Sequence, residues 1–199
     1  MKNLTAAILA IIVFIFSQHT SYAQRFSVSS NAVDWAALAT INAEGGVAVS
    51  RHISVHGGVR INPWVFRFGD PEVRFENPDG DDEKQFQYKK QAYNVGIRYW
   101  PWYIYSGFWF GARGQYMEYD RGGVFVHERE AGDAVGLGLS AGYTYMLHEH
   151  WNLDFGVGAW GGWKWYGTYR CTNCGRQIES GQKAFILPDF VSLSVMYIF

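Results

Sequence analysis

Residues 135–147 read Val-Gly-Leu-Gly-Leu-Ser-Ala-Gly-Tyr-Thr-Tyr-Met-Leu, and every second position in this stretch is apolar. The positions between them are mostly glycine or small polar residues. A helix would repeat its apolar positions every three to four residues, whereas a period of two is that of a β-strand with two different faces. The stretch therefore predicts a strand with one oily face and one small or polar face.

The same alternation recurs before and after this stretch, and no long helical stripe interrupts it. We expect eight strands, over residues 26–38, 42–50, 53–66, 87–100, 105–119, 133–147, 151–165 and 188–199. The first segment fits the alternation poorly at Asp34 and Trp35, which predicts a β-bulge there. Eight alternating strands are typical of an all-β, eight-stranded antiparallel up-and-down barrel.

The connections between these segments differ in length in a regular way. Linkers 51–52, 101–104 and 148–150 are short, whereas linkers 67–86, 120–132 and 166–187 are long and polar. Alternate connections of an up-and-down barrel lie at the same end, so the long loops would share one rim. Short periplasmic turns and long external loops are typical of outer-membrane barrels. The pattern therefore predicts a transmembrane barrel with three long extracellular loops.

Aromatic residues, which make up 18% of the chain, gather near the segment ends. Two belts of aromatic side chains commonly mark the two membrane interfaces. At the short-turn rim we expect Tyr99, Phe108, Tyr143, Tyr145, Trp151 and Tyr197, and at the long-loop rim Trp64, Tyr116, Trp163 and Trp165.

The first 23 residues resemble a secretory signal peptide. Lys2 precedes an apolar run over residues 4–16, and Ser21-Tyr22-Ala23 resembles a cleavage site. The run is shorter than the ~20 residues of a spanning helix. We therefore expect a cleaved signal over residues 1–23 and one barrel domain over residues 24–199, exported to the outer membrane of a Gram-negative cell. A formal net charge of -1 provides no basic surface for nucleic acid, so no nucleic-acid partner is expected.

The chain stops at Phe199, with Val195 and Tyr197 at the alternate positions before it. A final strand of this kind resembles the assembly signal of bacterial outer-membrane barrels. The barrel-assembly machinery is therefore an expected partner during biogenesis, and outer-membrane lipid and lipopolysaccharide are expected partners afterwards.

Three short motifs carry a family resemblance across nearly all of the chain after the signal. They are Asn62-Pro63-Trp64, Arg98-Tyr99-Trp100 and Cys171-x-x-Cys174-Gly175. A further stretch, Trp151-Asn152-Leu153, opens the seventh segment. In order and spacing they resemble the domain-of-unknown-function 3575 family of small outer-membrane barrels. The resemblance implies a membrane barrel, sometimes associated with surface-appendage gene neighbourhoods. It implies no established activity and no cofactor.

The two cysteines, Cys171 and Cys174, lie in the last long linker, and export would place them in an oxidising compartment. A local disulfide is the expected state, with a redox motif or half of a zinc site as alternatives. A zinc site would need further ligands, and His127 is the one candidate in another long linker. The short linker His148-Glu149-His150 does not have the spacing of a helical zinc motif and is expected to be a polar turn.

The inward faces of the predicted strands carry both signs of charge. An eight-stranded barrel is only wide enough to be filled by side chains, and buried charges need partners. We expect a charge network that plugs the lumen, formed by Glu44, His56, Arg60, Arg98, Arg113 and Asp154. No ion or solute channel is expected.

Three functions remain open at this point. The favoured one is a structural or adhesive role, in which the long loops contact an extracellular or fimbrial partner or lipopolysaccharide. Acidic runs at 79–84 and 128–133 could bind divalent cations that bridge lipopolysaccharide. The second is a lipid-modifying enzyme, for which His127 with Glu128 and Glu130, and Ser180 farther along, are the available groups. The third is a soluble periplasmic carrier of an apolar ligand. No catalytic residue, metal or cofactor is assigned.

Overall fold

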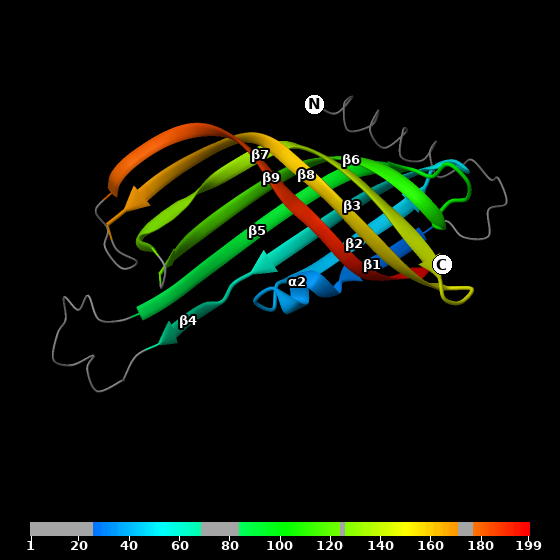
Figure 1. The fold of residues 1–199 in the computed structure, drawn as a ribbon, viewed down its shortest axis with the longest axis horizontal. Helices are drawn as coiled ribbons and strands as arrows, with labels where there is room; N and C mark the ends of the chain where they lie inside the picture. Colours follow the sequence, from blue (N-terminus) through cyan, green and yellow to red (C-terminus); the bar gives the residue numbers. More distant parts are fainter. Residues whose placement is uncertain (1–25, 69–83, 124–125, 171–176) are drawn as a thin grey trace, which may run out of the picture.

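The computed structural model describes residues 26–68, 84–123, 126–170 and 177–199 (Figure 1). It contains nine strands and one short helix. They are β1 (Phe26–Asn31), α2 (Ala32–Ala36), β2 (Ile41–Ala48), β3 (Ile53–Asn62), β4 (Val65–Phe68), β5 (Lys84–Tyr99), β6 (Gly107–Gly123), β7 (Val126–Met146), β8 (Trp151–Tyr169) and β9 (Gln177–Ile198). No helix within these ranges is long and apolar enough to span a membrane.

The sheet closes on itself as an eight-stranded antiparallel barrel. Neighbours in sequence pair along the sheet, β9 pairs with β1, and β3 pairs with β5. The ninth strand, β4, lies against β5 beyond the end of β3: Asn62 is opposite Lys90, and Val65 is opposite Gln87. Pro63, which has no N–H to donate to the ladder, lies at the break. The prediction of an eight-stranded antiparallel barrel is confirmed, and the third predicted strand is divided into β3 and β4.

The oily face of each strand points outward. On β7, Leu137 and Leu139 are 76% and 74% exposed, and on β5 Val95 is 62% exposed. The alternate side chains point into the lumen, where Asp154 and Asn152 of β8 are each 1% exposed. The predicted alternation is confirmed, and the barrel is polar inside and apolar outside.

Aromatic and aliphatic side chains close the short-turn end of the lumen. They are Trp100, Tyr105, Trp109, Met196 and Ile198, all buried. Gly142 of β7 makes room for this packing, because a Cβ there would collide with the Trp109 ring and with the carbonyl of Phe155. A smaller cluster of Tyr119, Ala134 and Trp160 lies farther along the lumen.

The first predicted strand, over 26–38, is wrong in its second half, and so is the bulge expected at Asp34 and Trp35. β1 ends at Asn31, whose side chain accepts a hydrogen bond from Val33 N (3.1 Å) and caps α2. The side-chain oxygen of Asn is a strong helix N-cap, which explains why the chain leaves the sheet there. After α2, Leu38 and Ala39 have positive φ angles of 58° and 51°, which turn the chain back into β2.

Two of the three long linkers are mostly strands. β6 ends at Gly123 and β7 begins at Val126. β8 ends at Tyr169 and β9 begins at Gln177. The predictions of loops over 120–132 and 166–187 are therefore wrong. Charged side chains pair across these strands, and such cross-strand pairs stabilise a sheet without an apolar face. In the third linker, residues 69–83 lie outside the described ranges.

The barrel wall is consequently longer on the side of β5 to β9 than on the side of β1 to β3 (Figure 1). β1, β2 and β3 have 6, 8 and 10 residues, whereas β5 to β9 have between 16 and 22. The long strands continue past the closed barrel as a curved open sheet, which we call the projection. It consists of β4 and the ends of β5 to β9 distant from the short turns.

Candidate functional site

Asp154 is the centre of the polar lumen. Its Oδ1 accepts hydrogen bonds from Trp109 Nε1 (2.7 Å) and Thr144 Oγ1 (2.6 Å), from β6 and β7. Its Oδ2 lies 3.5 Å from Nη1 of Arg98 on β5. Three strands thus converge on one buried carboxylate, as a charge removed from water requires.

Arg98 joins this carboxylate to a second one. Its Nη2 donates to Oε1 of Glu44 (2.6 Å), and its guanidinium lies 4.4 Å from the centre of the Trp109 ring. Nδ1 of His56 lies 3.5 Å from Oε2 of Glu44. A guanidinium suits this position because its planar fork can serve two carboxylates while its face stacks on an indole.

The remaining residues of the predicted charge network lie on either side of this group. Arg60 of β3 pairs through Nε with Oδ2 of Asp34 on α2 (3.4 Å). Arg113 of β6 is buried and lies opposite Gly138 of β7 in the ladder. All six predicted residues lie on the inner face of the barrel wall, and the structure joins Glu44, His56, Arg98 and Asp154 directly.

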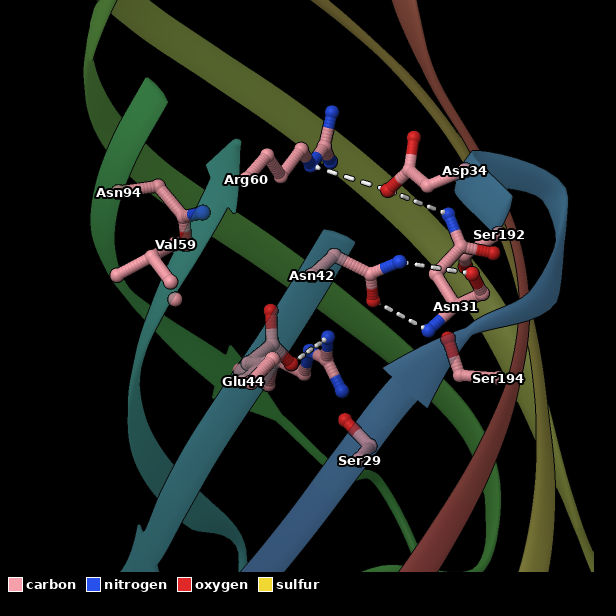
Figure 2. A pocket seen from close by; sticks show the side chains of 13 residues that line it. Ser29, Asn31, Asp34, Asn42, Glu44, Val59, Arg60, Asn94, Ser192 and Ser194 are labelled. Carbon is pink, nitrogen blue, oxygen red and sulfur yellow. Dashed lines mark hydrogen bonds and ion pairs between the residues drawn. The ribbon is translucent and has the colours of Figure 1, made fainter. Parts of the chain in front are cut away.

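A polar recess lies where α2 meets the barrel wall (Figure 2). Asn31 and Asn42 face each other across it, with Asn42 Nδ2 donating to the carbonyl of Asn31 (2.9 Å). The water-accessible volume is about 30 Å³, enough for one or two water molecules. The recess is lined by Ser29, Asn31, Asp34, Asn42, Ala43, Glu44, Gly58, Val59, Arg60, Asn94, Arg98, Ser192 and Ser194.

Sequence reasoning missed three members of this site. Asp34 and Asn31 were assigned to a strand, and the helix that directs Asp34 toward Arg60 has only five residues. Trp109 lies between two outward phenylalanines, so alternation within an aromatic run could not reveal its inward direction. The run Asn31-Ala-Val-Asp34, an N-cap residue followed by an acid in the first turn, is the signal that could have indicated α2.

The projection carries a second charged cluster on its inner face. Glu130 of β7 accepts hydrogen bonds through Oε1 from Tyr119 Oη (2.8 Å), Lys164 Nζ (2.8 Å) and Arg121 Nη2 (3.0 Å). Burial acts to raise the pKa of Glu130, but these hydrogen bonds and the charges of Arg121 and Lys164 hold it below its ordinary value. Burial, together with the hydrogen bond to the same carboxylate, raises the pKa of Tyr119. Three strands are thus joined beyond the closed barrel.

The outer face of the projection has its own ion pair. Arg129 donates from Nε and Nη2 to the two carboxylate oxygens of Asp120 (2.6 Å each), and Gln87 Nε2 donates to the same group (2.6 Å). A two-pronged Arg–carboxylate pair is among the stronger surface contacts. The projection is therefore held together by polar contacts on both faces.

The outer surface of the closed barrel carries aromatic side chains in pairs. At the short-turn rim, Phe108 packs edge-on against Tyr143 (4.9 Å between ring centres), and Trp151 packs against Tyr197 (5.0 Å). Toward the projection, the aromatic side chains expected at the other rim are also exposed. They are Trp64, Tyr116, Trp163 and Trp165.

The other candidate residues lie in turns, on exposed strands or outside the described residues. His150 lies in the β7–β8 turn, where its Nδ1 is 2.9 Å from the carbonyl oxygen of Ile198. Ser180 is exposed on β9. His127 and Glu128 belong to β7, but their side chains, and both Cys171 and Cys174, lie outside what the structure describes. Among the described residues, no group of three His, Cys, Asp or Glu side chains could hold a metal ion.

Comparison with known protein families gives a match over nearly the whole chain. The sequence profile of the family described as "Protein of unknown function (DUF3575)" matches residues 8–199, essentially the whole chain. No curated protein and no solved structure matches.

Proposed function

The chain belongs to the DUF3575 family, and from that premise we propose that it is an outer-membrane barrel with a plugged lumen that presents its projection at the cell surface as a binding scaffold. Residues 1–23 direct export and are then removed. The proposal comprises a location, a closed lumen and a binding role.

One observation carries the location: the outer face of the closed barrel is apolar. Leu137, Leu139 and Val157 are between 62% and 76% exposed, and the neighbouring strands expose residues of the same kind. A continuous apolar surface of this extent is rare on a protein that faces water. In lipid it is the favourable surface, and a closed barrel leaves no backbone group without a hydrogen-bond partner.

The polar projection supports the same orientation. Toward the projection, the outer face of β7 changes from apolar Val135 to charged Asp133 and Arg129. The outer face of β6 changes in the same direction from Tyr116 to Asp120. A tilted strand crosses the hydrocarbon with about 9 to 11 residues, whereas β7 has 21. The strand ends that carry Glu130 and Arg129 therefore extend into water, on the side opposite the short turns.

The filled lumen supports a scaffold in preference to a pore. Asp154, Arg98, Arg113 and Trp109 are each at most 5% exposed, and the recess beside α2 admits only water. A carrier of apolar ligands, the soluble alternative, would need its apolar face turned inward, and here that face points outward. The recognised partner is then an extracellular or fimbrial polypeptide or lipopolysaccharide, reached by the projection.

Fractionation of cells that express the full chain tests this proposal. We expect the protein in the outer-membrane fraction, with a faster-migrating band in unboiled samples, because closed barrels resist detergent until heated. A chain with Leu139→Asp is the matched control, since a charge on the lipid-facing side destabilises the inserted barrel and should reduce insertion. Soluble periplasmic protein without a heat-dependent shift would overturn the proposal.

A further inference from the structure

The N-terminal half of β9 has a free edge. β9 pairs with β8 from Gln177 to Tyr197, but with β1 only from Ser194 to Ile198. The side chain of Asn31 extends the β1 side slightly, donating to Val191 O (3.2 Å) and accepting from Leu193 N (3.0 Å). Beyond that point, among the residues that the structure describes, no strand pairs with the β1 side of residues 177–190.

The residues that face this edge can be identified from the ladder. Near Asn31 the odd-numbered residues Val191 and Leu193 direct their backbone groups toward β1. Backbone direction alternates along a strand, and the register shift between Gly158 and Trp160 adds one residue to β9. From Ile186 back to Ser180, the even-numbered residues therefore turn their N–H and C=O groups to the free edge. The pattern stops there, because a second register shift between Thr168 and Tyr169 leaves Ile178 as an extra residue of β9.

The two faces of this segment differ in chemistry. Outward, Ile186 is 83% exposed. Inward, Lys183 lies directly opposite Lys164 of β8. Lys164 is paired with Glu130, whereas no ion pair of Lys183 is found within the described residues. Like charges directly opposite each other destabilise a sheet, so an acidic group beside Lys183 would relieve an existing repulsion.

We propose that residues 180–186 of β9 bind an extended segment of another exported polypeptide, which adds a strand to the projection and places an acidic side chain next to Lys183. This rests on the proposed function, which places the projection in water outside the membrane. Backbone hydrogen bonds provide the affinity of such strand addition, and alternate side chains provide its specificity. The apolar side chains of the incoming strand lie on the same face as Ile186.

Edge strands are often protected from pairing by proline or by inward charges. Pro188 lies at the register shift next to the barrel and leaves the edge-facing N–H groups of residues 180–186 available. The inward charge here is a lysine beside a second lysine, which selects for acidic partners while rejecting basic ones.

Two synthetic peptides test the proposal with the purified full-length barrel in detergent. In one, valine alternates with glutamate, and in the other valine alternates with lysine. We expect the acidic peptide to bind about twofold to fivefold more tightly than the basic one, the ratio for one cross-strand charge pair. Lys183→Glu should reverse this preference. N-methylation of alternate residues of the acidic peptide, in the register that blocks its edge-facing N–H groups, should abolish binding.

Each outcome decides the matter. Binding of neither peptide would overturn the proposal and assign Lys183 to protection of the edge. Equal binding of the two would overturn it as well, because Lys183 would then select no acidic side chain. Binding that survives N-methylation would show that the β9 edge is not the site. All variants must retain the heat-dependent band shift. That shift tests the barrel itself, so failure of the membrane proposal is distinguishable from failure of strand addition.

Discussion

Arg98 Nη2 and Glu44 Oε1 lie 2.6 Å apart inside the barrel, although 54 residues separate them in sequence. They belong to β5 and β2, with β3 between them in the sheet. The contact therefore spans β3 on the lumen side of the sheet. Nη1 of Arg98 also lies 3.5 Å from Oδ2 of Asp154.

Replacing Arg98 by Met should therefore destabilise the barrel strongly. Two buried carboxylates would lose their shared cation, and breaking a buried pair costs about 3 to 5 kcal/mol. Urea unfolding in detergent measures the change. Adding Glu44→Gln to Arg98→Met should recover part of the loss, since one of the two unpaired charges is then removed. Equal stability of Arg98→Met and the unaltered chain would contradict the network.

Leu139→Arg should destabilise the barrel in lipid by about 2 to 4 kcal/mol, the cost of a cation at the middle of a membrane. Gln182→Arg is the matched control, because Gln182 lies on the projection and the same charge there should change stability by less than ~0.5 kcal/mol. Unfolding titrations in lipid vesicles compare the two. Similar small effects at both positions would argue against a lipid-facing surface at Leu139.

Deletion of Phe199 should reduce the amount of barrel in the outer membrane. Phe199 closes the ladder, with its N–H donating to Phe26 O (2.9 Å), and its ring packs on Tyr197 (4.8 Å between centres). Phe199→Tyr keeps an aromatic side chain and should assemble normally. Quantifying the heat-shifted band for both chains measures the effect, and normal assembly of the deleted chain would remove the assembly role of this residue.

The projection should loosen at low pH. The pKa of Glu130 is below its ordinary value, so the carboxylate binds fewer protons when folded than when unfolded. Its contribution is present above the ordinary pKa of about 4.3 and is lost as the pH falls through the lower folded value. Hydrogen exchange of β7 and β8 near Glu130 and Lys164 should therefore quicken below about pH 4, after correction for the intrinsic rate.

Glu130→Gln is the control for that measurement. The amide keeps the shape but does not titrate, so the protection it retains should not change over the same pH range. An unchanged pH response in this variant would assign the loosening to other carboxylates.

The sequence by itself determined the barrel. Alternation with a period of two is a local property, and it identified the outward and inward faces of residues 135–147 before any contact was known. Short breaks in the alternation are local too, so the connections at 51–52, 101–104 and 148–150 were found. The inward position of Arg98, Glu44 and Asp154 followed from the same parity, because it depends only on counting along each strand.

Which residues meet was decided by the tertiary structure. The register of β2, β3 and β5 brings Glu44 to Arg98, and the five-residue helix α2, which begins at an asparagine N-cap, brings Asp34 to Arg60. The long strands at 120–132 and 166–187 were missed for a related reason. Their stability comes from pairs such as Arg129–Asp120 and Lys164–Glu130, which form only when separate strands lie side by side, so no single segment shows a strand pattern.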